Sequence, residues 1–283
     1  MLGRHICGLK NVYYAQAMAF VEAEVRPRYR LGWPKSASPL LSIVIPTWNG
    51  GRQLSATLAH IRDFRAPLAF ATELLIVDDC SERSTARIAA DFAAENEQTV
   101  VLTNETNRGK GHAVARGMLQ ATGEYRIFVD SDLAYPSGQI TKLLHALRAG
   151  SDVAIACRVL PESRYVMSPT FFHYLYTRHL LSRLFNRVAQ QVLLPGILDT
   201  QAGLKGFTAR AAQMIFSRQT LCGFGFDFEC LYIARLHGLK IEQVPVDFYY
   251  SDEPSTISFA RHGAAMLMDL VRVRRNGARG IYA

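Results

Sequence analysis

Short apolar runs alternate with longer helix-compatible segments, and this alternation limits the fold more than any other feature of the chain. Five runs read as buried β-strands, because they are short, rich in Val, Ile and Leu, and bounded by polar or turn residues. They are LLSIVIP (40–46), ELLIVDD (73–79), TVVLTN (99–104), YRIFVD (125–130) and DVAIAC (152–157). Continuous apolar strands separated by helices are typical of a mostly parallel sheet with helices on both faces. We therefore predict an α/β protein whose ligand lies at the carboxyl ends of the strands.

Acidic residues follow two of these strands. Asp78 and Asp79 end the second run, and Asp130 and Asp132 lie at the end of the fourth. Residues two apart in an extended segment lie on the same side, so the carboxylates of Asp130 and Asp132 are expected to repel each other unless a cation compensates. Oxygen ligands of this kind suit Mg²⁺ or Mn²⁺ bridged to substrate phosphates. The alternative is that Asp130 caps the following helix or turn and that Asp132 is solvated.

The composition excludes several classes of protein. With 283 residues, 49% of them hydrophobic, the chain can bury a sizeable core. Its five scattered cysteines form no C-x-x-C pair, which argues against a zinc site and a secreted disulfide framework and favours a reducing compartment. We find neither a run of roughly 18 apolar residues nor a signal-peptide core, so a soluble or peripheral protein is expected. The net charge of +8 suits nucleic acid, an anionic membrane or a phosphorylated substrate, but the sequence shows no nucleic-acid recognition module.

A series of motifs resembles family 2 inverting glycosyltransferases of the GT-A fold. The first half contains SIVIPTWN, LLIVDDCS, NRGKGHAVARG and VDSDL, and the second half contains ACRV, DTQAGLKGF and FGFDFECLYIARLHG. The second set resembles segments of dolichyl- or polyprenyl-phosphate glucosyltransferases and mannosyltransferases. The resemblance covers about residues 40–275. It implies a mixed, mostly parallel sheet flanked by helices, and an enzyme that transfers a hexose from a nucleotide sugar to a polyprenyl or dolichyl phosphate. UDP-glucose is the favoured donor, with GDP-mannose as the alternative.

The resemblance also implies a nucleotide-sugar site. Residues 46–48 would form a floor under the base, and Asp78 would accept a hydrogen bond from the imide N–H of uracil or guanine. Asp130 and Asp132 would hold the metal on the diphosphate, with Asp132 as a direct ligand and Asp130 in contact with either the ribose or the metal. This chain has Gly50 where the family often has an acidic residue. The residues expected to bind the nucleotide sugar are Pro46, Thr47, Trp48, Asn49, Ile76, Asp78, Lys110, Asp130, Ser131 and Asp132.

The glycine-rich segment NRGKGHAVARG matches neither a P-loop nor the G-x-G-x-x-G pattern, and it follows the third strand rather than the first. Gly109 and Gly111 are expected to allow a tight strand-to-helix turn and close packing. Contact between Lys110 and a phosphate is the alternative.

The acceptor decides which residues catalyse the reaction. A phosphate acceptor is anionic at pH 7 and needs cations to position it, whereas a hydroxyl acceptor needs a general base. By resemblance, Arg158 and Lys205 would grip an acceptor phosphate. Asp227 would be the base or orienting carboxylate for a hydroxyl of a saccharide, lipid or small metabolite, or else a helix N-cap. Asp199 and Gln201 are acceptor contacts or turn residues. The expected catalytic set is Asp130, Asp132, Asp227, Arg158 and Lys205.

Three regions are expected along the chain: an N-terminal helical extension and linker (1–39), the glycosyltransferase domain (40–250), and a basic amphipathic helix and tail (251–283). Residues 171–192 are also amphipathic, and either pack on the core or lie at a bilayer interface. The C-terminal cations either attract an anionic membrane or remain solvated. A cytoplasmic protein is expected, with peripheral contact to the cytoplasmic face of a membrane as an open alternative. For the function, a non-catalytic nucleotide-sugar-binding module also stays open as an alternative. The C-terminal cations are Arg272, Arg274, Arg275 and Arg279.

Overall fold

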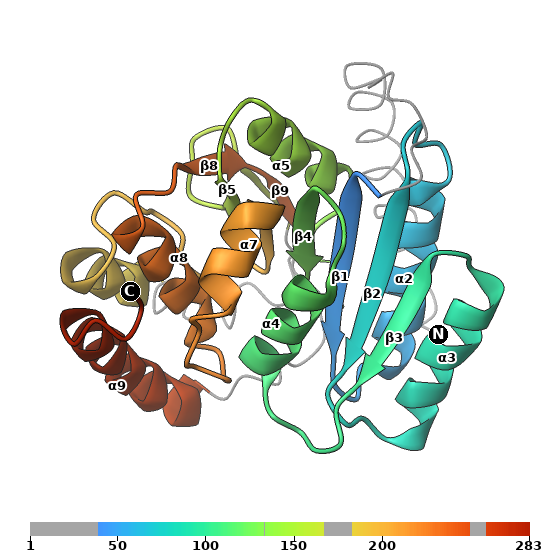
Figure 1. The fold of residues 1–283 in the computed structure, drawn as a ribbon, viewed down its shortest axis with the longest axis horizontal. Coiled ribbons are helices and arrows are strands. Elements are labelled where there is room, and N and C mark those ends of the chain that lie inside the picture. Colours follow the sequence, from blue (N-terminus) through green and yellow to red (C-terminus); the bar gives the residue numbers. More distant parts are fainter. Residues whose placement is uncertain (1–38, 133, 167–182, 250–258) are drawn as a thin grey trace, which may run out of the picture.

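The computed structural model describes residues 39–283 except residue 133 and the segments 167–182 and 250–258 (Figure 1). The first elements are β1 (Leu41–Thr47), α2 (Gly51–Arg65), β2 (Thr72–Asp78), α3 (Arg83–Glu95), β3 (Thr99–Thr103), α4 (Lys110–Gln120), β4 (Tyr125–Val129) and α5 (Gly138–Arg148). They are followed by β5 (Val153–Cys157), β6 (Arg164–Val166), helical residues 183–192, β7 (Leu204–Thr208), α7 (Ala209–Phe216), α8 (Phe226–Leu236), β8 (Ile241–Pro245), β9 (Asp247–Tyr249) and α9 (Phe259–Ala278). The N-terminal extension and the start of the 171–192 segment lie outside the described residues.

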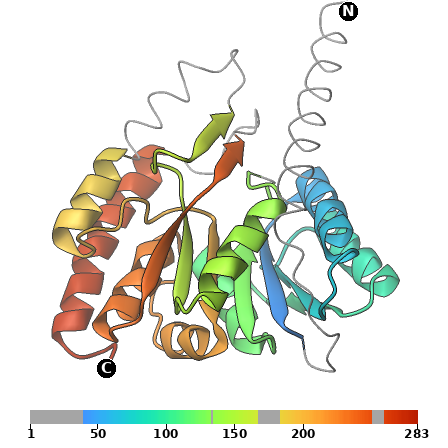
Figure 2. The same ribbon diagram turned by 90° about the horizontal axis from the view of Figure 1, so that it is seen from above.

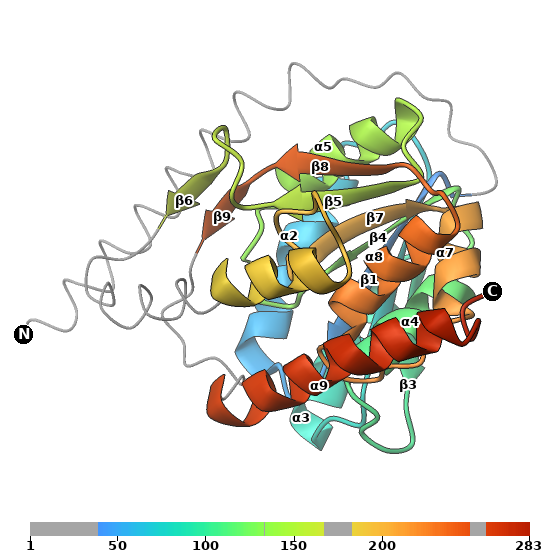
Figure 3. The same ribbon diagram turned by 90° about the vertical axis from the view of Figure 1, so that its left-hand side faces the viewer.

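A seven-stranded sheet organises the fold, in the order β3-β2-β1-β4-β7-β5-β8. Neighbouring strands are parallel, except that β7 runs antiparallel to both β4 and β5. The mixed, mostly parallel α/β sheet predicted from the sequence is confirmed, and each of the five predicted runs forms a strand. A second, two-stranded sheet joins β6 to β9, and Figures 2 and 3 show it projecting beyond the main sheet.

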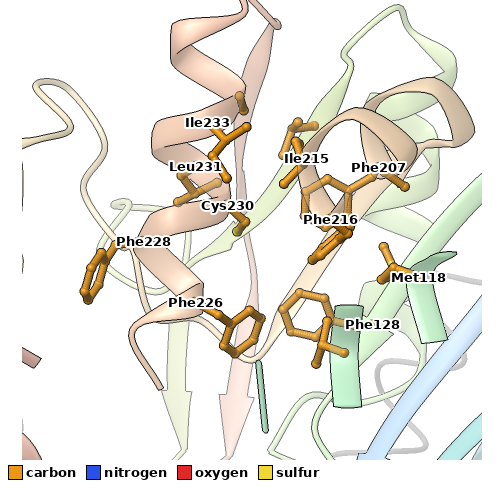
Figure 4. Close-up of a cluster of buried hydrophobic side chains, with 14 of the residues drawn as sticks. Met118, Phe128, Phe207, Ile215, Phe216, Phe226, Phe228, Cys230, Leu231 and Ile233 are labelled. Carbon is orange, nitrogen blue, oxygen red and sulfur yellow. The ribbon is translucent and has the colours of Figure 1, made fainter. Parts of the chain in front are cut away.

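Apolar side chains from the strands fill two cores, one on each face of the sheet. Val44 and Val77 point toward the core shared with α4, α7 and α8, whereas Ile43 and Ile76 point toward the core shared with α2 and α5. Because successive residues of a strand face opposite sides, a strand buried on both faces needs an uninterrupted apolar run. Figure 4 shows the first core, in which aromatic rings such as Phe128, Phe207 and Phe226 gather.

The turn into α4 depends on two glycines. Gly109 has a φ of 95°, which favours glycine, and a Cβ there would lie 2.5 Å from the Cys222 carbonyl oxygen. A Cβ on Gly111 would lie 2.7 Å from the Leu221 carbonyl oxygen. The prediction that Gly109 and Gly111 allow a tight turn and close packing is confirmed. They bring the N-terminus of α4, and with it Lys110, against the loop that precedes α8.

The C-terminal end of the chain is tied to α8 by a buried carboxylate. Glu229 accepts hydrogen bonds from the backbone N–H groups of Thr220 and Leu221, and from the Tyr282 hydroxyl at 2.7 Å. The ring of Tyr282 is also fully buried. These contacts fix α9 along the outside of the molecule (Figure 3). Among the described residues, we find no helix with the length and apolar character needed to cross a bilayer.

Candidate active site

The carboxyl ends of β1, β2 and β4 meet at one edge of the sheet and bring the predicted nucleotide residues together. β1 and β2 are in register up to the pair Thr47 and Asp78, and β4 lies on the other side of β1. Trp48 is exposed just beyond β1, whereas Asp78 is buried and accepts a hydrogen bond from the Ser81 backbone N–H at 3.1 Å. The Thr57 hydroxyl of α2 donates to the Ser131 carbonyl at 2.8 Å and so fixes the loop after β4.

The other predicted nucleotide residues support this edge. Pro46 and Ile76 are buried within the adjacent strands β1 and β2. Asn49 joins the loops after these strands, because its side-chain oxygen accepts the Glu82 backbone N–H at 2.7 Å and its own N–H donates to the Ser81 hydroxyl at 2.9 Å. Asn49 therefore positions Trp48, which precedes it.

Asp79, next to Asp78, holds the glycine-rich turn in place. Its carboxylate is buried and accepts the backbone N–H groups of Arg108 at 3.0 Å and of Gly109 at 2.7 Å, together with the Asn104 side-chain amide at 2.6 Å. These bonds satisfy the buried charge with strong donors. Asp79 thus holds the glycine-rich turn that positions Lys110.

Lys110 is the cation beside the Asp130 carboxylate. Its ammonium donates to Asp130 Oδ2 at 2.9 Å and lies 2.7 Å from Oδ1. Burial opposes the charge on Lys110, but the carboxylates of Asp130, Asp227 and Asp132 outweigh this and raise its pKa, so it stays protonated. The backbone of Gly203 lies close to the Asp130 carboxylate, since a Cβ there would lie 2.0 Å from Asp130 Oδ2. The helix that follows, α5, has Ser137 as its N-cap residue and no side-chain cap, so Asp130 does not cap that helix.

Asp132 remains exposed next to this ion pair, and its Oδ1 accepts the backbone N–H of Ala134 at 3.0 Å. Desolvation by the surrounding protein, followed by repulsion from Asp130, raises the pKa of Asp132. We find no group of three metal-ligating side chains in the part of the chain that the structure describes. Two hard carboxylates fit Mg²⁺ or Mn²⁺ nonetheless, because these ions take one or two carboxylates and fill their other positions with phosphate oxygens and water.

A fully buried ion pair lies behind Lys110. The Lys205 ammonium donates to Asp227 Oδ1 and, at 2.8 Å, to the Ala202 carbonyl, and it lies 5.4 Å from the centroid of the Phe128 ring. Asp227 lies in the first turn of α8, whose N-cap residue is Gly225 and which has no side-chain cap. The alternative that Asp227 caps this helix is wrong. That Lys205 contacts an acceptor stays a prediction.

A second ion pair links β5 to the loop before β7. Arg158 donates to Asp199 Oδ2 from Nε at 2.7 Å and to Oδ1 from Nη2 at 2.9 Å, and its backbone N–H adds a third bond at 3.1 Å. Burial alone raises the pKa of Asp199, but the Arg158 charge and hydrogen bonds outweigh burial and lower it. Gln201 donates its backbone N–H to Asp199 Oδ1 at 3.3 Å, and its side chain lies 3.7 Å from the Met266 sulfur of α9.

Tyr135 was not among the residues expected at this site from the sequence. Its ring is buried, and its hydroxyl oxygen has no hydrogen-bond partner among the residues that the structure describes. Nothing in the sequence distinguishes this tyrosine from an ordinary core residue, because the missing partner is a property of the folded site.

Comparisons with known proteins agree with this geometry. The sequence model of the family described as "Glycosyl transferase family 2" matches residues 42–216. A dolichyl-phosphate beta-glucosyltransferase of Dictyostelium discoideum is 30% identical over 252 residues, which cover 86% of this chain and 76% of the relative. The Homo sapiens enzyme of the same name is 31% identical over 227 residues, covering 75% and 68%.

Two solved structures show the same fold. Glucosyl-3-phosphoglycerate synthase from Mycobacterium tuberculosis, in complex with Mn²⁺, UDP-glucose and phosphoglyceric acid, matches with a TM-score of 0.60 at 17% identity, covering 84% of this chain and 80% of that one. Mannosyl-3-phosphoglycerate synthase from Rubrobacter xylanophilus matches with a TM-score of 0.62 at 18% identity, covering 93% and 78%. The expected GT-A fold and enzyme class are confirmed, and the chain belongs to glycosyl transferase family 2.

Proposed function

We propose that this protein transfers glucose from UDP-glucose to the phosphate of a polyprenyl phosphate, with inversion at the anomeric carbon and with Mg²⁺ or Mn²⁺ held by Asp130 and Asp132. The observation that carries the proposal is this pair of carboxylates at the shared edge of β1, β2 and β4, in a chain 30% identical to a dolichyl-phosphate beta-glucosyltransferase.

Four residues of the donor half would contact the nucleotide sugar. The exposed Trp48 ring offers a surface for the base, and Asp78 offers a carboxylate to the imide N–H of uracil. Asp132 is accessible at the edge where the diphosphate would lie. A divalent ion there would supply Lewis-acid neutralisation of the departing UDP. Lys110, kept protonated beside Asp130, adds a fixed positive charge next to the leaving group.

The acceptor half favours a phosphate over a hydroxyl. A hydroxyl acceptor needs a general base, and an ion-paired carboxylate is a weakened base because its partner stabilises the charged form. Asp199 is held in this way by Arg158, and the buried carboxylate of Asp227 accepts a hydrogen bond from the Lys205 ammonium. An acceptor phosphate is already anionic and needs only a cation to position it. Arg158, oriented by two bonds to Asp199, suits that task because a guanidinium offers several donors in a fixed plane.

Transfer assays test the proposal directly. We expect purified protein with Mn²⁺ or Mg²⁺ to transfer glucose from UDP-glucose to a short polyprenyl phosphate and not to the corresponding alcohol, as measured by UDP release and mass spectrometry of the product. GDP-mannose is expected to be a poorer donor. Equal transfer to the alcohol would favour a hydroxyl acceptor. The absence of both UDP release and UDP-glucose binding would contradict the function altogether.

The outer face of α9 suits contact with a membrane that carries such an acceptor. Exposed apolar side chains at Leu267, Met268 and Val271 lie close to four exposed arginines. Cations close to an anionic surface each add about 1 kcal/mol of attraction. We expect co-sedimentation with phosphatidylserine vesicles at low salt, weakened when Arg272, Arg274, Arg275 and Arg279 are all replaced by Gln. Equal binding to neutral vesicles, or none to anionic vesicles, would contradict a membrane role for these residues.

A further inference from the structure

Tyr135 has a buried polar group whose hydrogen-bonding capacity is unused in the described part of the protein. Its side chain is only 3% exposed, yet its hydroxyl oxygen has no hydrogen-bond partner there. A buried hydroxyl without a partner destabilises a folded protein, because it has lost its bonds to water. Such a group needs an explanation, and a ligand that completes its hydrogen bond is one.

The contacts around Tyr135 show in which part of the site it lies. Two hydrogen bonds hold the residue before it: the Ala134 N–H donates to Asp132 Oδ1 at 3.0 Å, and the Ala134 carbonyl accepts the Tyr249 N–H at 2.9 Å. The Tyr135 ring packs edge-on against Phe248 with centroids 5.1 Å apart, and the Arg158 guanidinium lies 5.2 Å from the same Phe248 ring. Tyr135 therefore lies between the carboxylates of the donor half and the arginine of the acceptor half.

Burial raises the pKa of Tyr135 well above its usual value, with the charge of Arg158 opposing this effect and the carboxylates of Asp199, Asp130 and Asp132 adding to it. The hydroxyl therefore keeps its proton at neutral pH and can both donate and accept a hydrogen bond. Those are the requirements for binding another hydroxyl.

We propose that the Tyr135 hydroxyl hydrogen-bonds a hydroxyl group of the transferred sugar and so contributes to donor selection. The inference rests on the proposed function, in which the sugar moves from the diphosphate at Asp132 to an acceptor at Arg158 and must lie between these two residues. A site that forms a hydrogen bond to a substrate hydroxyl discriminates against donors that lack it, because the protein group is then left unpaired.

Replacing Tyr135 by Phe separates this role from a structural one. Without ligand, we expect the Tyr135→Phe variant to unfold at the same temperature as the wild type or higher, because the change removes an unpaired buried hydroxyl. In the presence of Mn²⁺, calorimetry should show UDP-glucose binding weakened about tenfold (about 1.4 kcal/mol), while UDP binding changes less than about twofold.

Tyr282→Phe is the matched control. The Tyr282 hydroxyl is paired, since it donates to Glu229 at 2.7 Å and accepts from the Asn276 amide at 3.2 Å. This variant should melt at a lower temperature than the wild type and bind UDP-glucose normally.

Any of four results for Tyr135→Phe would overturn the inference: a melting temperature lowered as much as in Tyr282→Phe, equal weakening of UDP and UDP-glucose binding, unchanged UDP-glucose binding, or a higher KM for the polyprenyl phosphate with unchanged UDP-glucose affinity. UDP-glucose binding by the wild type distinguishes a failure of this inference from a failure of the proposed function. A wild type that binds no UDP-glucose contradicts both, whereas normal binding by wild type and variant contradicts the inference alone.

Discussion

Replacing Asp132 by Asn is expected to reduce glucosyl transfer about a thousandfold, a loss of about 4 kcal/mol in transition-state stabilisation. The physical reason is that the charge on the departing diphosphate must be neutralised without a proton transfer, and Asp132 is the accessible carboxylate at that edge of the sheet. An amide of the same shape keeps one oxygen but loses the negative charge that attracts a divalent ion. The measurement is kcat/KM for UDP-glucose at saturating Mn²⁺.

Stability measurements distinguish this loss from misfolding. Asp132 is exposed and is repelled by Asp130, so its neutral replacement should unfold at the wild-type temperature or slightly above. The control is Asp91→Asn, which removes an exposed carboxylate of α3 paired with Arg87 across one helical turn and should leave activity unchanged. A rise in unfolding temperature on adding Mn²⁺ and UDP should disappear in Asp132→Asn alone. Retention of more than about a tenth of the wild-type activity would contradict a metal-binding role for Asp132.

The sequence predicted the parts of this site that depend on local pattern. The runs at 40–46, 73–79 and 125–130 are apolar on both faces, which identifies buried parallel strands, and parallel strands end at a common edge. That Asp78 and Asp130 lie at the same edge of the sheet follows from those two facts. Gly109 and Gly111 could be assigned to a tight turn because the glycine-rich segment lies between a strand and a helix.

The pairing of charges could not be predicted in the same way, because it depends on contacts between distant parts of the chain. β7 enters the sheet between β4 and β5 in the antiparallel direction, and this brings Lys205 to α8. No periodic pattern of apolar residues in the sequence predicts that β7 lies between β4 and β5. Lys205 and Arg158 were both expected at an acceptor phosphate, but only the fold shows that each is bound to a buried carboxylate. Lys110 likewise became the partner of Asp130 only because Asp79 and the two glycines place the start of α4 beside β4.

Lys205→Met is expected to destabilise the protein by about 3–5 kcal/mol, because it leaves the buried Asp227 carboxylate without its partner. The Lys205 side chain is 0% exposed and that of Asp227 only 5%, so neither charge can be solvated without moving the chain. Methionine keeps the length of the side chain and the packing against Phe128. The measurement is the free energy of unfolding from urea denaturation at pH 7.

A double variant separates the missing partner from a simple packing defect. Removing both charges in Lys205→Met/Asp227→Asn should recover most of the lost stability, since a buried ion pair replaced as a unit is often nearly neutral. The double-mutant cycle should therefore give a large coupling energy, whereas the cycle for the exposed pair Arg87 and Asp91 should give little. If the double variant is as unstable as the sum of the two single variants, the two charges do not stabilise each other. Asp227 would then be a carboxylate available to the substrate, and a hydroxyl acceptor would be favoured over a phosphate.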